Sequence, residues 1–133
     1  TAYEIVDCDW SSDVCSSDLS TIGPADAHHS FAMFDRSKSQ TIVGTVKELE
    51  LINPHGWLQL MVADDKGGAT LWLLEMGGAG QMARSGWTQE RVHPGDKVTA
   101  MFHPLRDGSN GGQLVSVALP GGATLSTNFP GGR

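Results

Sequence analysis

Histidine side chains are the groups in this chain best suited to chemistry. The five of them are His28, His29, His55, His93 and His103. If His28 stood at the amino terminus, its α-amine and imidazole would chelate one ion together, and His29, His55 or His103 would add a third nitrogen. Amine and imidazole donors suit Cu(II), which prefers tetragonal nitrogen sites. The pattern therefore predicts a metal site, with copper as its ion and His28, His29 and His55 as its ligands. The alternative is that His28 and His29 form a solvated tail and that His55 stabilises its own turn.

Export would create that amino terminus. Ala25-Asp26-Ala27 has the small-x-small form of a secretory cleavage site, and cleavage after it would leave His28 first. We therefore predict a periplasmic protein in which residues 20–27 are the remnant of a signal peptide. A chance occurrence of the motif is the alternative, because alanine is common.

Two tryptophans and one carboxylate are the other candidates for binding. Trp57 and Trp72 either line a binding face or pack in a core, as tryptophans in small domains commonly do. Glu75 ends an apolar stretch, and we interpret it as a strand-end carboxylate that faces water. The alternative is an inward Glu75 beside His55, either as a partner that supports a ligand or as an acid or base. No catalytic triad, carboxylate pair or phosphate loop is recognisable, which predicts that the protein is not an enzyme.

Residues 1–19 read as translated sequencing adaptor rather than as native protein. DWSSDVCSSDL at residues 9–19 back-translates to a common short-read adaptor, and TAYEI at residues 1–5 fits the other end of that adaptor. The segment holds both cysteines, Cys8 and Cys15, together with five acidic residues and no basic ones. The net charge of −6 then becomes −1, from 10 acidic and 9 basic residues. A near-neutral chain lacks the basic surface that nucleic acids require, and no apolar run approaches the roughly 20 residues of a membrane span.

The remaining residues, 28–133, predict a single all-β domain with one short helix. Strands are expected at 41–51, 57–63, 69–76, 97–103 and 113–119, with a short sixth segment at 123–125. A helix centred on 81–84 interrupts them, with Gly86 placed to end it. The alternation of the first strand changes phase near Lys47 and Glu48, which indicates a bulge. Three strands, a helix and two strands are the order of an OB-like Greek-key barrel, and a different small barrel or roll is the alternative.

From His28 onward the chain resembles a family of small exported bacterial proteins of unknown function. The motifs that carry the resemblance are HHSF at 28–31, GTV at 44–46, NPH at 53–55, EMG at 75–77, GW at 86–87, PGD at 94–96, DGS at 107–109 and LP at 119–120. The resemblance implies a cleaved signal peptide before the paired histidines and a periplasmic location. It implies no activity.

Three functional hypotheses follow. The first is a non-catalytic periplasmic domain that binds a small ligand or a metal ion, copper in its most specific form. The second is a protein-interaction or envelope-accessory module that uses a face around Trp57 and Trp72. The third is a hydrolase or another enzyme built on Glu75 and His55.

Overall fold

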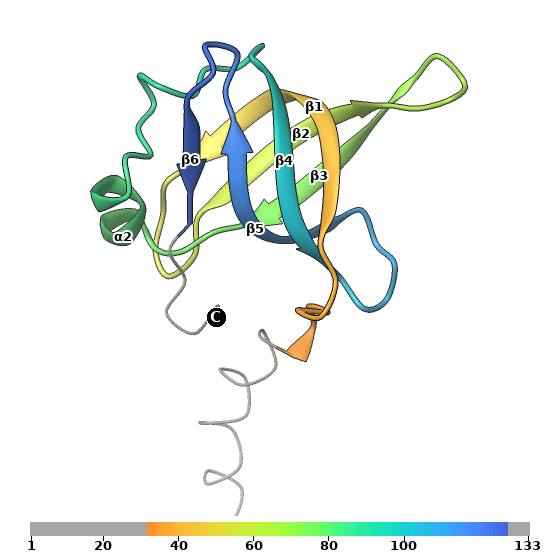
Figure 1. Ribbon diagram of the computed structural model, residues 1–133, viewed down its shortest axis with the longest axis horizontal. Coiled ribbons are helices and arrows are strands. Elements are labelled where there is room, and N and C mark those ends of the chain that lie inside the picture. Colours follow the sequence, from red (N-terminus) through yellow and green to blue (C-terminus); the bar gives the residue numbers. More distant parts are fainter. Residues whose placement is uncertain (1–31, 128–133) are drawn as a thin grey trace, which may run out of the picture. The chain divides into compact units, whose positions relative to one another are not determined.

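Six strands and one short helix make up the part of the chain that the computed structural model describes, residues 32–127. They are β1 (Gln40–Glu50), β2 (Trp57–Ala63), β3 (Ala69–Glu75), α2 (Ala79–Arg84), β4 (Lys97–Pro104), β5 (Gly111–Ala118) and β6 (Thr124–Ser126). Neighbouring strands pair in the order β3-β2-β1-β4-β5-β6, and β3 also pairs with β5 in parallel. The first five strands thus close into a barrel (Figure 1). This confirms the predicted OB-like β-β-β-α-β-β fold.

The predicted strand limits agree with the observed ones to within about two residues, and the bulge lies where the phase change placed it. The β1–β2 register shifts between Val46 and Glu48. Val46 and Leu49 are both buried although they are three residues apart. Regular alternation would send them to opposite faces of the strand, so one extra residue must be accommodated between them.

The barrel interior is filled by apolar side chains that alternate along the strands. Trp87, which follows α2, is fully buried, and its indole N–H donates to the carbonyl of Ser126 at 3.0 Å. The bond ties the segment after α2 to β6, the strand that lies beyond the closed barrel. The buried core consists of Val46, Leu49, Leu58, Leu60, Leu74, Met76, Met82, Trp87, Val92, Val98, Ala100, Phe102, Leu114, Val117 and Leu125.

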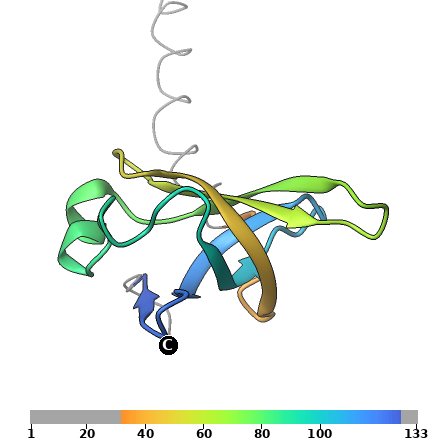
Figure 2. The same cartoon turned by 90° about the horizontal axis from the view of Figure 1, so that it is seen from above.

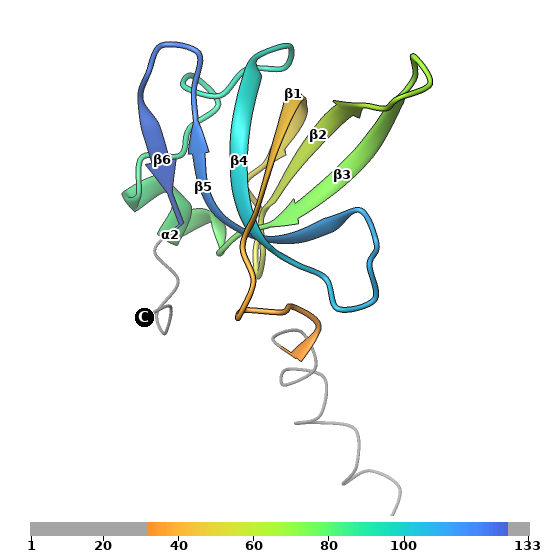
Figure 3. The ribbon, with the colours of Figure 1, turned by 45° about the vertical axis from the view of Figure 1, so that its right-hand side comes forward.

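The start of β5 completes the barrel. Residues 111–113 pair with β3 on one side and with the end of β4 on the other (Figure 3). A Cβ at Gly112 would collide with the carbonyl oxygen of His103, so only glycine allows the two strands to approach so closely. The β2–β3 hairpin projects on the side away from α2 (Figure 2).

A short lead-in brings residues 33–39 against the β4–β5 loop. Phe34 is buried and forms a β-bridge with Leu105, while the N–H of Asp35 donates to the carbonyl of Pro104 at 2.8 Å. Residues from Met33 onward belong to one compact unit. Within residues 32–127, no helix has both the length and the apolar character needed to cross a membrane.

Candidate ligand-binding site

His55 and Glu75 meet where the β1–β2 loop reaches the end of β3. Nδ1 of His55 lies 3.3 Å from Oε1 of Glu75. The loop is held there from both sides. The Asn53 side-chain oxygen accepts a hydrogen bond from the N–H of Ala79 at 3.0 Å, and backbone hydrogen bonds join Gly56 to residues 76 and 77. A Cβ at Gly56 would stand 2.7 Å from the carbonyl oxygen of Glu50, so glycine at this position permits the close approach of loop and strand.

Glu75 is mostly buried, with 12% of its side chain exposed. Burial raises the pKa of its carboxyl group because desolvation penalises the charged form, and the charge that His55 acquires on protonation acts in the opposite direction. The interpretation of Glu75 as a strand-end carboxylate facing water is therefore wrong. The β1–β2 loop folds back over the end of β3 and shields most of the Glu75 side chain from water.

The buried amide of Gln113 lies on the strand next to Glu75 and adds a third polar side chain to the pair formed by His55 and Glu75. Gln113 lies beside Glu75 in the parallel β3–β5 register and opposite His103 in the β4–β5 register. Only 3% of Gln113 is exposed, and its Oε1 has no hydrogen-bond partner. The Nδ1 of His55 also lacks a hydrogen bond, since its contact with Glu75 is close but not aligned as one. Gln113 was not among the residues predicted from the sequence, because a glutamine at the start of a predicted strand carries no sign of burial.

Glu75 forms part of the wall of an apolar hollow of about 230 Å³. We call it the apolar hollow. It is lined by Met33, Phe34, Trp57, Leu73, Glu75, Leu105, Ser109, Asn110, Gly111 and Gly112. Among these residues Glu75 is the only ionisable one, and Trp57 is its direct cross-strand neighbour.

A second hollow of about 370 Å³, which we call the charged hollow, adjoins the first. It shares Leu105, Ser109 and Gly111 with the apolar hollow, so the β4–β5 loop borders both. Trp72 and Leu73 are adjacent on β3 and point to opposite faces of the strand, so the two hollows lie on different sides of it. The charged hollow is lined by Asp35, Lys38, Gln40, Trp72, Pro104, Leu105, Arg106, Gly108, Ser109 and Gly111. The two hollows together are called the binding groove below.

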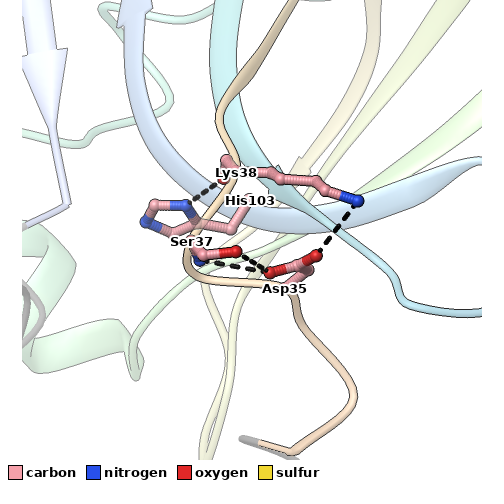
Figure 4. Close-up of polar contacts among 4 residues, drawn as sticks. All are labelled: Asp35, Ser37, Lys38 and His103. Atoms are coloured by element: carbon pink, nitrogen blue, oxygen red, sulfur yellow. Dashed lines mark hydrogen bonds and ion pairs between the residues drawn. The ribbon is translucent and has the colours of Figure 1, made fainter.

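Polar contacts fix the charged hollow in place (Figure 4). The imidazole of His103 donates to the carbonyl of Lys38 at 2.7 Å, which anchors the lead-in to β4. Asp35 accepts from the hydroxyl of Ser37 at 2.5 Å and pairs with the Lys38 ammonium at 3.4 Å. The Ser37 hydroxyl is the main cause of the lowered pKa of Asp35. Trp72 packs edge-on against Phe102, with ring centroids 5.6 Å apart, so one tryptophan serves both the core and the hollow.

The structure brings some of the predicted site residues together and leaves others apart. Trp57 and Glu75 line the apolar hollow, His55 contacts Glu75 from outside it, and Trp72 lines the charged hollow. His28 and His29 lie outside the described residues. Within residues 32–127, no three histidine, cysteine or acidic side chains come close enough to hold a metal ion. A copper site would therefore need ligands from outside this range.

Comparison with known proteins gives a family and no function. No curated protein and no solved structure matches the chain. One family model does match, over residues 18–115, and thus over most of the chain and all of the binding groove. The chain therefore belongs to a family of unknown function (DUF6152).

Proposed function

We propose that the protein is a non-catalytic, periplasmic domain that binds a small organic molecule in the binding groove. The observation that carries the proposal is that two hollows of opposite character border the same β4–β5 loop. The apolar hollow offers aromatic and aliphatic walls, and the charged hollow offers Lys38, Asp35 and Arg106. Ligand sites are typically concave and mostly apolar, with a few polar groups that orient the ligand. The β2–β3 face and the β4–β5 loop are also the surfaces with which OB-folds bind ligands.

The placement of His55 supports a binding role rather than a catalytic one. Glu75 contributes to the wall of the apolar hollow, whereas His55 contributes to neither hollow. An acid and a base must both reach the reacting atoms of a substrate. A histidine behind the carboxylate supports Glu75 without presenting a second reactive group to the ligand.

Nile red, a neutral apolar dye, tests the groove in the full chain. Leu73 and Leu71 provide a matched pair, because both are exposed on β3, two residues apart on one face, and only Leu73 lines the apolar hollow. We expect Leu73→Ser to weaken dye binding about fivefold or more by removing apolar contact area. Leu71→Ser should leave it unchanged. Equal effects of the two substitutions, or no dye binding by the unsubstituted protein, would overturn the proposal.

Export is supported by the cleavage motif Ala25-Asp26-Ala27 and is tested separately. We expect the protein isolated from the cells that encode it to begin at His28 and to be released with the periplasmic fraction. Mass spectrometry of the amino-terminal peptide distinguishes this from a longer, uncleaved start.

Copper binding is a second, narrower proposal that the His55–Glu75 contact favours. Histidines that bind metals commonly place the other ring nitrogen near a carboxylate, and Nδ1 of His55 lies 3.3 Å from Oε1 of Glu75, although not aligned as a hydrogen bond. Cu(II) titration by calorimetry and EPR would compare protein that begins at His28 with protein carrying one extra residue before it. We expect tight binding only in the first, and weaker binding after His55→Ala. Equal binding in all three would overturn the copper proposal.

A further inference from the structure

We propose that the ligand is a small organic cation, an ammonium with an apolar chain, and that Glu75 is its counter-ion in the apolar hollow. The inference rests on the proposed function and specifies the class of molecule that the groove receives. Three features of the apolar hollow support it: the charge of Glu75, the aromatic and aliphatic side chains of the lining, and the desolvation of the Glu75 carboxylate.

Charge complementarity selects the ammonium. Glu75 is the single ionisable group among the described residues that line the apolar hollow, and the other polar side chains there, Ser109 and Asn110, are neutral. The cationic side chains of the groove, Lys38 and Arg106, line the charged hollow instead. An anion in the apolar hollow would face the Glu75 carboxylate without a balancing charge, whereas an ammonium would find its counter-ion.

The walls suit the rest of such a molecule. Trp57 is the cross-strand neighbour of Glu75, and Phe34 supplies a second aromatic ring. Aromatic rings attract ammonium groups through their negative faces, and the attraction grows when the site is desolvated. Leu73, which is 42% exposed, and Met33 provide apolar surface for a hydrocarbon chain.

The carboxylate also gains from such a ligand. Burial leaves the charged form of Glu75 poorly solvated, and this raises the pKa of its carboxyl group. An ammonium would replace the lost solvation and favour the ionised carboxylate. His55 is the titratable group in contact with Glu75, and lowering the pH protonates the Glu75 carboxylate itself, which removes the counter-ion. Affinity for the cation should therefore fall as the pH is lowered.

Three six-carbon probes that differ only in their head groups test the inference on the full chain. Hexylammonium, hexanol and hexanoate are titrated by calorimetry and by displacement of Nile red. We expect hexylammonium to bind about tenfold or more tightly than hexanol, which corresponds to about 1.4 kcal/mol, and hexanoate to bind weakest. Glu75→Gln should abolish the preference for the ammonium over hexanol. Glu50→Gln is the matched control, because Glu50 lies opposite Trp57 on β1 and lines neither hollow.

The outcomes separate this inference from the proposed function. If all three probes bind equally, or if hexanoate binds best, the groove binds ligands and the cation inference is overturned. If Nile red binds and none of the three probes displaces it, the inference is again overturned and the proposed function remains. If neither the dye nor the probes bind, the proposed function and the cation inference are both overturned. Because the preference among probes is measured on the unsubstituted protein, the test does not depend on the folding of Glu75→Gln.

Discussion

The barrel interior and the patch around Glu75 both hold buried side-chain atoms, but they are built in opposite ways. The interior consists of apolar side chains, and its one indole N–H, that of Trp87, has a partner at 3.0 Å. The patch lies where the β1–β2 loop, β3 and β5 meet, and it holds a carboxylate, an imidazole and an amide. Within the described residues, the buried side-chain nitrogen and oxygen atoms that lack a hydrogen bond are Gln113 Oε1 and His55 Nδ1.

The difference shows which region serves stability. A buried polar group without a partner costs free energy, typically about 1–3 kcal/mol. Sequences that specify a fold satisfy such groups, and natural proteins depart from this rule mainly at functional sites. The apolar hollow opens beside the same patch, so the departure and the ligand-sized space coincide.

Substitution of the core tryptophan should have the largest effect. Trp87→Ala removes a fully buried ring and its bond to Ser126, so we expect the free energy of unfolding to fall by about 3–5 kcal/mol. Trp57→Ala, in the partly exposed wall of the apolar hollow, should cost about 1 kcal/mol and weaken Nile red binding. Urea unfolding followed by circular dichroism measures both variants. Equal losses would show that the wall of the hollow is as important for folding as the core.

A substitution that hinders closure of the barrel should have the next largest effect on the free energy of unfolding. The Cβ of Gly112→Ala would meet the His103 carbonyl, and backbone cannot move aside as a flexible side chain can. We expect a loss of about 1–3 kcal/mol, together with weaker dye binding because residues 111 and 112 line the apolar hollow. Gly121→Ala is the control, since its Cβ would meet nothing within 4 Å, and it should change stability by less than about 0.5 kcal/mol. A similar loss in both variants would contradict the role assigned to Gly112.

The fold was predictable because its signals are local. Alternating apolar residues marked the strands, and the phase change before Leu49 marked the bulge. The helix was placed correctly and is shorter than the predicted stretch 77–86, since it runs from Ala79 to Arg84. The order of elements then leaves few ways to close a sheet, and the OB-like barrel is one of them.

The site was predictable only in part, because its burial depends on long-range contacts. His55, Trp57, Trp72 and Glu75 were selected by type, and three of the four line the groove. The exposure of Glu75 was predicted wrongly because the loop that covers it is held by the bond from Ala79 to Asn53, 26 residues apart in the chain. The charged hollow was missed for a similar reason, since it arises where the lead-in crosses the β4–β5 loop.

Removal of the unpartnered amide should increase stability. Gln113→Met keeps a similar length and shape without the buried Oε1, so we expect a gain of about 1 kcal/mol in the free energy of unfolding. Leu114→Met, one residue further into β5 and inside the barrel, should instead lose up to about 1.5 kcal/mol. Parallel urea titrations compare the two. A loss for Gln113→Met would mean that the amide stabilises the fold, and the contrast between patch and interior would then weaken.

The smallest effect is a change in how stability depends on pH. The raised pKa of Glu75 means that the folded protein binds this proton more tightly than the unfolded chain does, so stability falls as the pH rises through the interval between the two pKa values. Glu75→Gln carries no such proton. It should therefore be more stable than the parent protein at about pH 7.5 and equal to it at about pH 4, below the ordinary pKa of glutamate.

Thermal unfolding of the parent, Glu75→Gln and Glu50→Gln proteins across this pH range measures the effect. The difference in stability between Glu50→Gln and the parent should not change with pH in this way. The opposite slope, with the parent more stable at the higher pH, would mean that the contact with His55 outweighs desolvation at Glu75. The carboxylate would then already have its counter-ion in the folded protein. An incoming ammonium would then have to compete with His55 for the carboxylate, and the physical reason for the cation preference of the apolar hollow would be lost.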